Sequence, residues 1–272
     1  MDYYTSLIFK NCKSNKYKIN SVIPELKYKS FFLNKNNLLR FNRYVSYPRQ
    51  IKNKSGDLNH IIDHGYTHLI SKLDPKKTIV TVHDLMGLVA RDNVVDGLEY
   101  QHYPLLLKYS LSYLKQAKLI IAVSENTKKD IMHYLKISDD KIKVIYNPIN
   151  PIFKNNMNID KKKILKKLGI AWSGEYLIMI TGNQIYKNHI SSIKVIDKLS
   201  DKYRLKLIVL SNNSEYFKNI FNKLNFNTPF HFTGKLKLEE LAELYQCISC
   251  LMFPSLYEGF GWPILEAMAS GT

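Results

Sequence analysis

Short β-branched runs alternate with helical segments along most of the chain, and this alternation restricts the fold more than any other feature. In the first half the runs lie at 78–82, 118–123 and 143–146, and helices are expected over 98–116 and 125–136. Strands that alternate with helices of this length form parallel sheets with helices on both faces. We therefore predict an α/β fold built from doubly wound, Rossmann-like sheets.

A second series of the same kind follows a break at residues 147–153, NPINPIF, where two prolines interrupt regular structure. A short lysine-rich helix that ends at Gly169 comes first. The expected strands and helices then alternate as 176–182, 189–200, 206–211, 214–224, 230–234, 237–246 and 248–253. The prediction is two domains, residues 1–150 and 151–272, each with its own parallel sheet.

Residues 255–268, SLYEGFGWPILEAM, carry the densest set of chemical features in the chain. Glu258 and Glu266 stand eight residues apart around a Gly-Phe-Gly turn, and a proline follows where a helix is expected to begin. The backbone of Gly259 and Gly261 can approach a ligand closely, and the N–H groups of a helix start attract an anion such as a diphosphate. Because carboxylates accept hydrogen bonds from hydroxyls, the segment favours a sugar nucleotide. Two solvated glutamates in a plain connection are the alternative.

The segment resembles the E-x7-E signature of retaining glycosyltransferases of family 4, which have the two-domain GT-B architecture. The resemblance implies that Glu266 binds the ribose of the nucleotide and that Glu258 meets the donor sugar in the catalytic site. It also implies that the backbone of Gly259–Phe260–Gly261 lies along that sugar and its phosphates. The implied activity is transfer of a hexose, with mannose as one option, from a nucleotide sugar to a hydroxyl of a polysaccharide, lipopolysaccharide or glycolipid acceptor. The anomeric configuration would be retained.

The loop TGNQIYKNH, residues 181–189, follows the first strand of the second half. Gly182 permits a tight turn, and Lys187 can meet a phosphate as a compact positive charge, although a solvated lysine in a polar loop is an equal reading. The loop is similar to the G-x-x-x-x-K-N segment of the family, which implies donor-binding roles for Gly182, Lys187 and Asn188. The family often has an arginine a few residues before this lysine. Since none stands here, one diphosphate contact is expected to be missing or supplied elsewhere.

Polar residues in the first half are the candidates for the acceptor side. His83 and Asp84 end the strand at 78–82. An isolated His-Asp pair is more often structural, but a strand that ends in this pair is recurrent in the family. The resemblance therefore implies that His83 is a polar contact in the reaction centre and Asp84 an orienting group or weaker base. Ser124 is a lesser acceptor-side candidate, for which a helix cap is an equal interpretation.

HIIDHGYTHL, residues 60–69, spaces three histidines and an aspartate as metal ligands often are. Gly65 favours a strand that passes into a loop, so no metal site is predicted, and the resemblance implies donor binding without a metal or other cofactor. His64 is the best candidate here for lining the acceptor side. Cys247 and Cys250 have redox or metal spacing but no second pair, which predicts that both belong to the core.

Positive charge is concentrated at the start of the chain. Of the net +17, residues 1–55 contribute +10, from 12 basic and 2 acidic side chains. This favours contact with an anionic membrane surface, and no nucleic-acid motif accompanies the charge. No apolar run approaches the roughly 18 residues needed to span a bilayer, and neither an export signal nor a disulfide framework is visible. The predicted location is the cytoplasm, at most peripheral at the inner face of the membrane.

Two departures from the family pattern leave other functions open. Members usually begin with a strand and a glycine-rich loop, but no glycine precedes Gly56, and the chain stops in the middle of a motif at 268–272. The resemblance is therefore expected to cover residues 57–272, with a second domain that is incomplete and exposes apolar surface. The alternatives are a non-catalytic truncated paralogue or fragment that binds nucleotide weakly, and a GT-B sugar-nucleotide epimerase.

Overall fold

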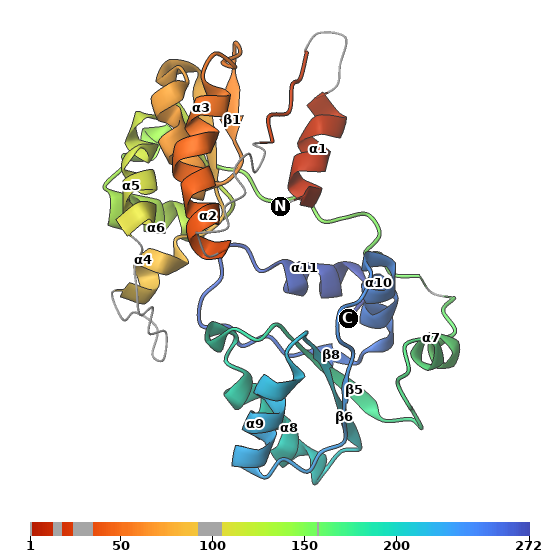
Figure 1. The fold of residues 1–272 in the computed structure, drawn as a ribbon. Helices are drawn as coiled ribbons and strands as arrows, with labels where there is room; N and C mark the ends of the chain where they lie inside the picture. The colour runs from red at the N-terminus through yellow and green to blue at the C-terminus, as the bar shows by residue number, and fades with distance from the viewer. Residues whose placement is uncertain (1, 13–17, 24–34, 92–104, 157) are drawn as a thin grey trace. The chain divides into compact units, whose positions relative to one another are not determined.

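The computed structural model describes residues 2–12, 18–23, 35–91, 105–156 and 158–272. The chain separates into two compact units. Of the described residues, those up to 147 belong to unit 1 and those from 148 onward belong to unit 2. Each unit has its own four-stranded parallel sheet with flanking helices (Figure 1), which confirms the predicted α/β class.

The sheet of unit 1 has the strand order β1-β2-β3-β4, with all neighbours parallel. The strands are β1 (Asn59–Ile61), β2 (Thr78–Val82), β3 (Leu119–Ala122) and β4 (Ile142–Val144). Val80, Val82 and Ile120 are completely buried, as expected for strands covered on both faces. The predicted strand at 143–146 was placed too late, because β4 begins at Ile142 and ends at Val144, and the exposed residues Ile145 and Tyr146 follow it.

The helices of unit 1 include a π-helical segment, η1 (Asn42–Ser46), which joins α2 to α3. Of the helix predicted at 98–116, residues 98–104 lie outside the described residues, and α5 and η4 form the remainder. The other elements are α1 (Asp2–Cys12), α2 (Lys35–Phe41), α3 (Tyr47–Ile51), η2 (His64–Lys72), η3 (Pro75–Lys77), α4 (Met86–Arg91), α5 (Leu105–Ser112), η4 (Leu114–Gln116), α6 (Glu125–Leu135) and η5 (Asp139–Lys141).

The sheet of unit 2 has the strand order β7-β6-β5-β8. Its strands are β5 (Tyr176–Thr181), β6 (Leu205–Leu210), β7 (Phe230–Phe232) and β8 (Cys250–Leu251). The strand predicted at 248–253 is shorter in the structure, because β8 lies at the edge of the described sheet, where it pairs with β5. Cys247 is buried at the end of α10 (Leu238–Cys247), but Cys250 is exposed on β8, so the prediction of two core cysteines was wrong for Cys250.

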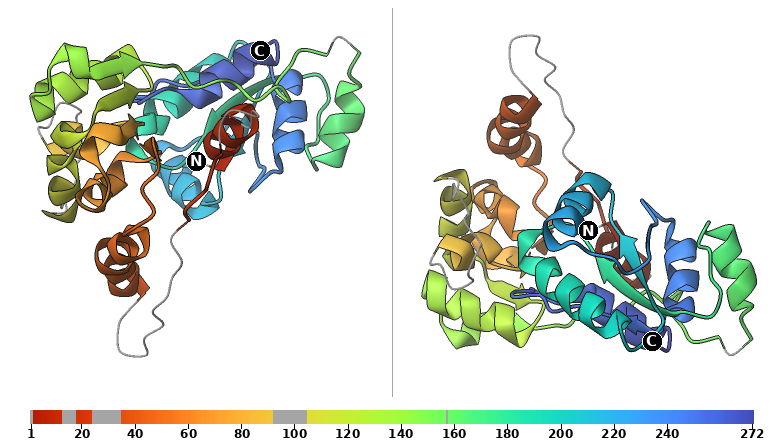
Figure 2. Two further views of the ribbon diagram at one scale, coloured as in Figure 1. Left: turned by 90° about the horizontal axis from the view of Figure 1, so that it is seen from above. Right: turned by 90° about the horizontal axis from the view of Figure 1, so that it is seen from below.

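Helices cover both faces of this sheet (Figure 2). Each face has its own apolar core. Leu207 and Val209 of β6 pack with Phe217 on one face, whereas Ile208 packs with Tyr245 on the other, because successive strand residues point to opposite sides. The helices are α7 (Lys161–Lys167), η6 (Ile185–Lys187), α8 (His189–Ser200), α9 (Ser214–Leu224), α10 (Leu238–Cys247) and α11 (Trp262–Ala269). Among the described residues, no helix combines the length and apolarity that a membrane crossing requires.

Candidate functional site

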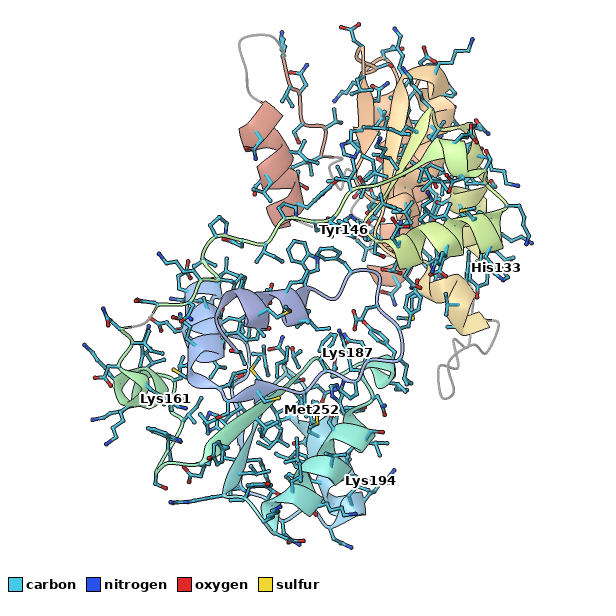
Figure 3. All side chains as sticks on the ribbon, turned by 180° about the vertical axis from the view of Figure 1, so that it is seen from behind. His133, Tyr146, Lys161, Lys187, Lys194 and Met252 are labelled. Atoms are coloured by element: carbon cyan, nitrogen blue, oxygen red, sulfur yellow. The ribbon has the colours of Figure 1, made fainter. Side chains whose placement is uncertain are left out.

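The strand order of unit 2 gives its sheet a switch point, which is a position at the carboxyl edge where two loops diverge. From β5 the chain moves outward through β6 to β7, and it then returns to add β8 on the opposite side of β5. In open parallel sheets, ligands bind outside the carboxyl ends of strands at such a switch point. The loop after β5 carries Lys187 and the loop after β8 carries Glu258, so both sequence-predicted segments start at this position (Figure 3).

Gly182 is required by the turn that ends β5. Its φ is +83°, and a Cβ atom there would lie 2.8 Å from Oε1 of Gln184. Its N–H donates to the carbonyl of Leu210 on β6, at 3.1 Å, which fixes the loop to the sheet. Asn188 is also left-handed, with φ +56°, and precedes α8 without a side-chain cap. The predicted tight turn is therefore present, and the loop ends at the start of a helix.

His189, the first residue of α8, was not recognised in the sequence. Only 3% of it is exposed, and burial together with the nearby charge of Lys187 lowers its pKa to about 4. A hydrogen bond to the backbone of Gly182 acts in the opposite direction. The imidazole is therefore neutral at neutral pH and links the two ends of the loop that holds Lys187. In the sequence, nothing about the histidine that follows Lys187 and Asn188 distinguishes it from a solvated histidine.

Lys187 and Glu258 form an ion pair, with 2.7 Å between Nζ and Oε1. The side chains are 11% and 24% exposed, respectively. The ammonium also lies 4.4 Å from the ring centroid of Phe253 and 5.3 Å from that of Tyr186. The structure thus brings together two residues that lie 71 positions apart in the sequence.

A backbone hydrogen bond joins the two loops. The N–H of Leu256 donates to the carbonyl of Tyr186 at 2.8 Å, one residue before Lys187. The aromatic partners Tyr186 and Phe253 belong to the same junction. The position of Lys187 relative to Glu258 is therefore set by main-chain contacts as well as by charge.

Helix α11 begins at this junction, as predicted. Gly261 precedes it with φ +83°, and Pro263 occupies its first turn. A Cβ atom on Gly261 would contact only Cδ1 of Ile264, at 3.7 Å, so the glycine is needed for its conformation rather than for space. The first turn contains no acidic side chain. Its N–H groups and the positive end of the helix can therefore attract an anion.

Glu266 lies one turn into α11, and its Oε2 accepts a hydrogen bond from the hydroxyl of Tyr245 at 3.2 Å. Burial raises the pKa of Glu266, while this hydrogen bond lowers it. Burial and the nearby carboxylate also raise the pKa of Tyr245, which is 1% exposed and remains a donor. Tyr245 was not identified from the sequence, because nothing in α10 indicates that it reaches α11.

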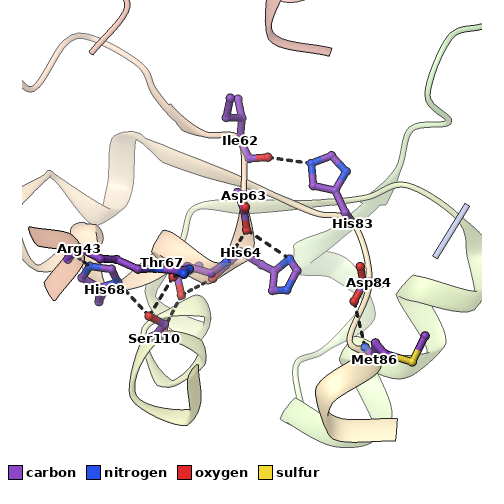
Figure 4. Close-up of polar contacts among 11 residues, drawn as sticks. Arg43, Ile62, Asp63, His64, Thr67, His68, His83, Asp84, Met86 and Ser110 are labelled. Carbon is purple, nitrogen blue, oxygen red and sulfur yellow. Dashed lines mark hydrogen bonds and ion pairs between the residues drawn. The ribbon is translucent and has the colours of Figure 1, made fainter. Parts of the chain in front are cut away.

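Unit 1 gathers its candidate residues at the carboxyl ends of β1 and β2 (Figure 4). Nε2 of His83 donates to the carbonyl of Ile62 at 2.8 Å, and Oδ1 of Asp84 accepts from the N–H of Met86 at 3.0 Å. Both side chains therefore have local structural partners. His64 lies close enough that Asp63, Asp84 and His83 all influence its pKa. The structure thus brings His64, His83 and Asp84 to one edge.

His64 retains unused hydrogen-bonding capacity. Its buried Nδ1 has no hydrogen-bond partner among the residues that the structure describes, and it lies 3.8 Å from Oδ1 of Asp63. Burial lowers its pKa, while the carboxylates of Asp63 and Asp84 oppose that change. Nδ1 of this imidazole is therefore a buried polar atom whose hydrogen-bonding capacity is not satisfied by the described residues.

His60 and Tyr4 extend this polar edge through Thr81. Nε2 of His60 lies 2.8 Å and the hydroxyl of Tyr4 lies 3.1 Å from Oγ1 of Thr81. The ring of Tyr4 meets that of His83 edge to face, with centroids 5.6 Å apart. Burial and the proximity of His83 lower the pKa of His60 to about 4. Tyr4 was not identified from the sequence, because the segment before Gly56 shows no recognisable pattern.

His68 and Arg43 make contacts that fix the loop after β1 (Figure 4). His68 is buried between Oγ of Ser110, at 2.9 Å, and the carbonyl of Arg43, at 3.0 Å. The guanidinium of Arg43 donates to the carbonyl of Gly65 and lies 4.1 Å from the ring centroid of Tyr66. A Cβ atom on Gly65 would lie 2.1 Å from Nη2 of Arg43, so glycine is needed for this close approach. Arg43 was also missed, since it lies in a π-helical segment that sequence patterns do not indicate.

Ser124 caps α6, as the alternative interpretation expected. Its Oγ accepts from the N–H of Thr127 at 3.0 Å. An acceptor-side role for Ser124 stays a prediction. Within the described ranges, no group of three or more histidine, cysteine, aspartate or glutamate residues is arranged to hold a metal ion.

Family models match both halves of the chain. The model described as Glycosyltransferase Family 4 matches residues 7–152, and the model described as Glycosyl transferases group 1 matches residues 160–272. The first match begins well before residue 57. The expectation that the resemblance would be poor over the first 55 residues was therefore wrong for most of that segment.

Individual proteins give the same result. An uncharacterised glycosyltransferase of Methanocaldococcus jannaschii is 29% identical over 171 residues, which cover 60% of this chain and 44% of the relative. The O-antigen chain mannosyltransferase RfbU of Salmonella typhimurium is 29% identical over 196 residues, or 71% and 50% of the two chains. The chain thus spans about half the length of these curated relatives.

A solved structure supports the same fold. WaaG, a glycosyltransferase involved in lipopolysaccharide biosynthesis, aligns with a TM-score of 0.65 and 18% identity. The alignment covers 91% of this chain and 65% of WaaG. At this identity the similarity concerns the fold alone, and it agrees with the two parallel sheets described above.

Proposed function

Since this chain belongs to glycosyltransferase family 4, we propose that it transfers a sugar from a nucleotide-sugar donor to a hydroxyl group of a glycan or lipid-linked acceptor. The observation that carries the proposal is the junction in unit 2, where Lys187, Glu258 and the start of α11 meet at the switch point of the sheet. Cell-envelope glycan synthesis is the proposed setting and mannose the first donor sugar to test, because RfbU is an O-antigen mannosyltransferase.

The donor-binding roles follow from the chemistry of the junction. Lys187 and the N–H groups of α11 would bind the diphosphate, and Glu266 would accept hydrogen bonds from the ribose hydroxyls. Glu258 would accept hydrogen bonds from hydroxyls of the donor sugar. The loops of Gly182–Asn188 and Gly259–Phe260–Gly261 would bring their backbone close to the phosphates and the sugar.

In the proposed reaction, the bond between the anomeric carbon and the diphosphate oxygen breaks, and its electron pair stays on the leaving diphosphate. The acceptor oxygen forms the new bond on the same face of the sugar, so the configuration is retained, and its proton passes to the leaving phosphate. Negative charge on the diphosphate grows as the bond breaks. Lys187 and the α11 start therefore stabilise the transition state more than the bound donor. These groups supply the positive charge, so the reaction is proposed without a metal or other cofactor.

The acceptor-side roles are proposed for unit 1. His64 is the first candidate to contact the acceptor hydroxyl, because its side chain is 15% exposed and its Nδ1 is not hydrogen-bonded to any described residue. His83 and Asp84 would act mainly by shaping this edge, since each is engaged with the backbone. Ser124 would be a minor contact beside its capping role.

A thermal-shift screen against GDP-mannose, UDP-glucose, UDP-N-acetylglucosamine and ADP-glucose tests donor binding, because a ligand that binds only the folded protein raises its apparent stability. Glu266→Ala should weaken the shift, and Lys187→Ala should lower turnover of the donor. Lys194→Ala, at an exposed position of α8, is the matched control. No shift with any nucleotide sugar would contradict the proposal. Binding without transfer would favour the non-catalytic alternative.

An anionic membrane surface is proposed as a further partner, and the cytoplasm as the location, from the charge of +10 in residues 1–55. Flotation with vesicles that contain phosphatidylglycerol should recover the protein, and the recovery should fall as salt is raised. Equal recovery with vesicles of phosphatidylcholine alone would contradict an electrostatic contact.

A further inference from the structure

The ammonium of Lys187 already has a partner within the protein itself. Oε1 of Glu258 lies 2.7 Å from Nζ, and aromatic rings flank the ammonium at 4.4 and 5.3 Å. Only 11% of the lysine side chain is exposed. The group proposed to bind the diphosphate is thus held by a carboxylate from the loop after β8.

A diphosphate and Glu258 are both anions, and they compete for the same ammonium. Two anions on one compact ammonium repel each other, so a bound diphosphate favours release of the carboxylate. We infer that donor recognition at this site is an exchange of partners, in which the diphosphate takes Lys187 and the released Glu258 accepts hydrogen bonds from the hydroxyls of the donor sugar. This inference rests on the proposed function and adds a specificity-determining role for Glu258.

The exchange distinguishes the donor from the product that is left after transfer. An intact nucleotide sugar supplies a partner for each side chain, namely phosphate for Lys187 and hydroxyls for Glu258. A nucleoside diphosphate supplies only the first and leaves a half-buried carboxylate without its counter-charge, which is unfavourable. Glu258 therefore disfavours the free nucleoside diphosphate, and its return to Lys187 promotes release of that product.

Glu258→Gln tests the exchange, because it removes the competing charge and keeps the shape of the side chain. The variant should bind at least one of UDP, GDP and ADP about tenfold more tightly than the unaltered protein, the change that corresponds to about 1.4 kcal/mol. Its affinity for the matching nucleotide sugar should not rise, so its preference for the intact donor should fall. Isothermal titration calorimetry at constant ionic strength gives both values.

Glu243→Gln is the matched control. Glu243 also pairs with a lysine of unit 2, Lys167, at 2.7 Å, but these side chains are 35% and 54% exposed. Its loss should leave nucleoside diphosphate binding unchanged. In the background of Lys187→Met, the gain expected from Glu258→Gln should disappear, because the ammonium that the two anions share is gone.

Unchanged or weaker binding of all three nucleoside diphosphates by Glu258→Gln would overturn the inference, and so would a gain that persists without Lys187. A ligand-free measurement gives a separate test. The effects of Glu258→Gln and Lys187→Met on the urea midpoint should be non-additive, and additive effects would show that the pair does not couple. Failure of the proposed function is a different result, since it is the absence of any thermal shift of the unaltered protein with nucleotide sugars.

Discussion

His189 should make unit 2 sensitive to acid. The folded protein lowers the pKa of this imidazole to about 4, chiefly through burial and then through the charge of Lys187, from the usual value of 6.5. Between these two pH values the unfolded chain binds more protons than the folded chain. The stabilising contribution is therefore fully present above about pH 6.5 and is lost as the pH falls toward about 4.

The size of the effect follows from the shift. A difference of 2.5 pKa units corresponds to about 3 kcal/mol in total, and about 2 kcal/mol of this is lost between about pH 7 and about pH 5. His189→Asn removes the titrating group and keeps an N–H donor near the backbone of Gly182. Between about pH 7 and about pH 5, the free energy of unfolding should therefore fall by about 2 kcal/mol less in this variant than in the unaltered protein.

Urea unfolding followed by tryptophan fluorescence measures this difference within one unit, because the chain has two tryptophans, Trp172 and Trp262, and both belong to unit 2. His60 also has a lowered pKa, but it lies in unit 1. His133→Asn, at an exposed position of α6, is the control for the substitution itself. Equal losses of stability in the unaltered protein and in His189→Asn would refute the reasoning.

Three further substitutions test other contacts. Tyr245→Phe removes the hydrogen bond that lowers the pKa of Glu266, so on acidification nucleotide affinity should be lost at a higher pH than in the unaltered protein, as a pH series of titrations would show. Ser124→Ala should destabilise unit 1 by about 1 kcal/mol, because the cap of α6 is lost, and circular dichroism during urea unfolding measures this change. If the variant retains transfer activity, an acceptor-side role for Ser124 is excluded. Gly65→Ala should displace the guanidinium of Arg43 and cost about 1–2 kcal/mol in the same assay, but markedly less in the background of Arg43→Ala.

The fold was predictable where strands are buried on both sides. The run TIVTV coincides with β2, because a central strand of a parallel sheet has no polar face and so stands out as apolar. The ends of β4 and β8 were misplaced, since an edge strand ends where its single neighbour stops pairing, and the sequence does not record that length. Cys250 was assigned to the core because the sequence does not show that β8 lies at the edge of its sheet.

The local geometry of the candidate site was predictable where the backbone needs a glycine. Gly182 and Gly261 both have positive φ, as a tight turn and a helix start demand. Lys187 and Glu258 were each assigned to the donor, but their direct contact was not foreseen. His189 and Tyr245 were missed because their importance comes from contacts with other segments.

The hydrogen bond from Leu256 to Tyr186 has a practical consequence for engineering. Because it fixes the spacing of two loops, neither can be lengthened or exchanged alone without separating the charged residues they carry. A chimera that takes the segment after β5 from a relative with another donor should also take residues 252–261 from that relative. The two segments would then be exchanged as one unit, although they are far apart in the chain.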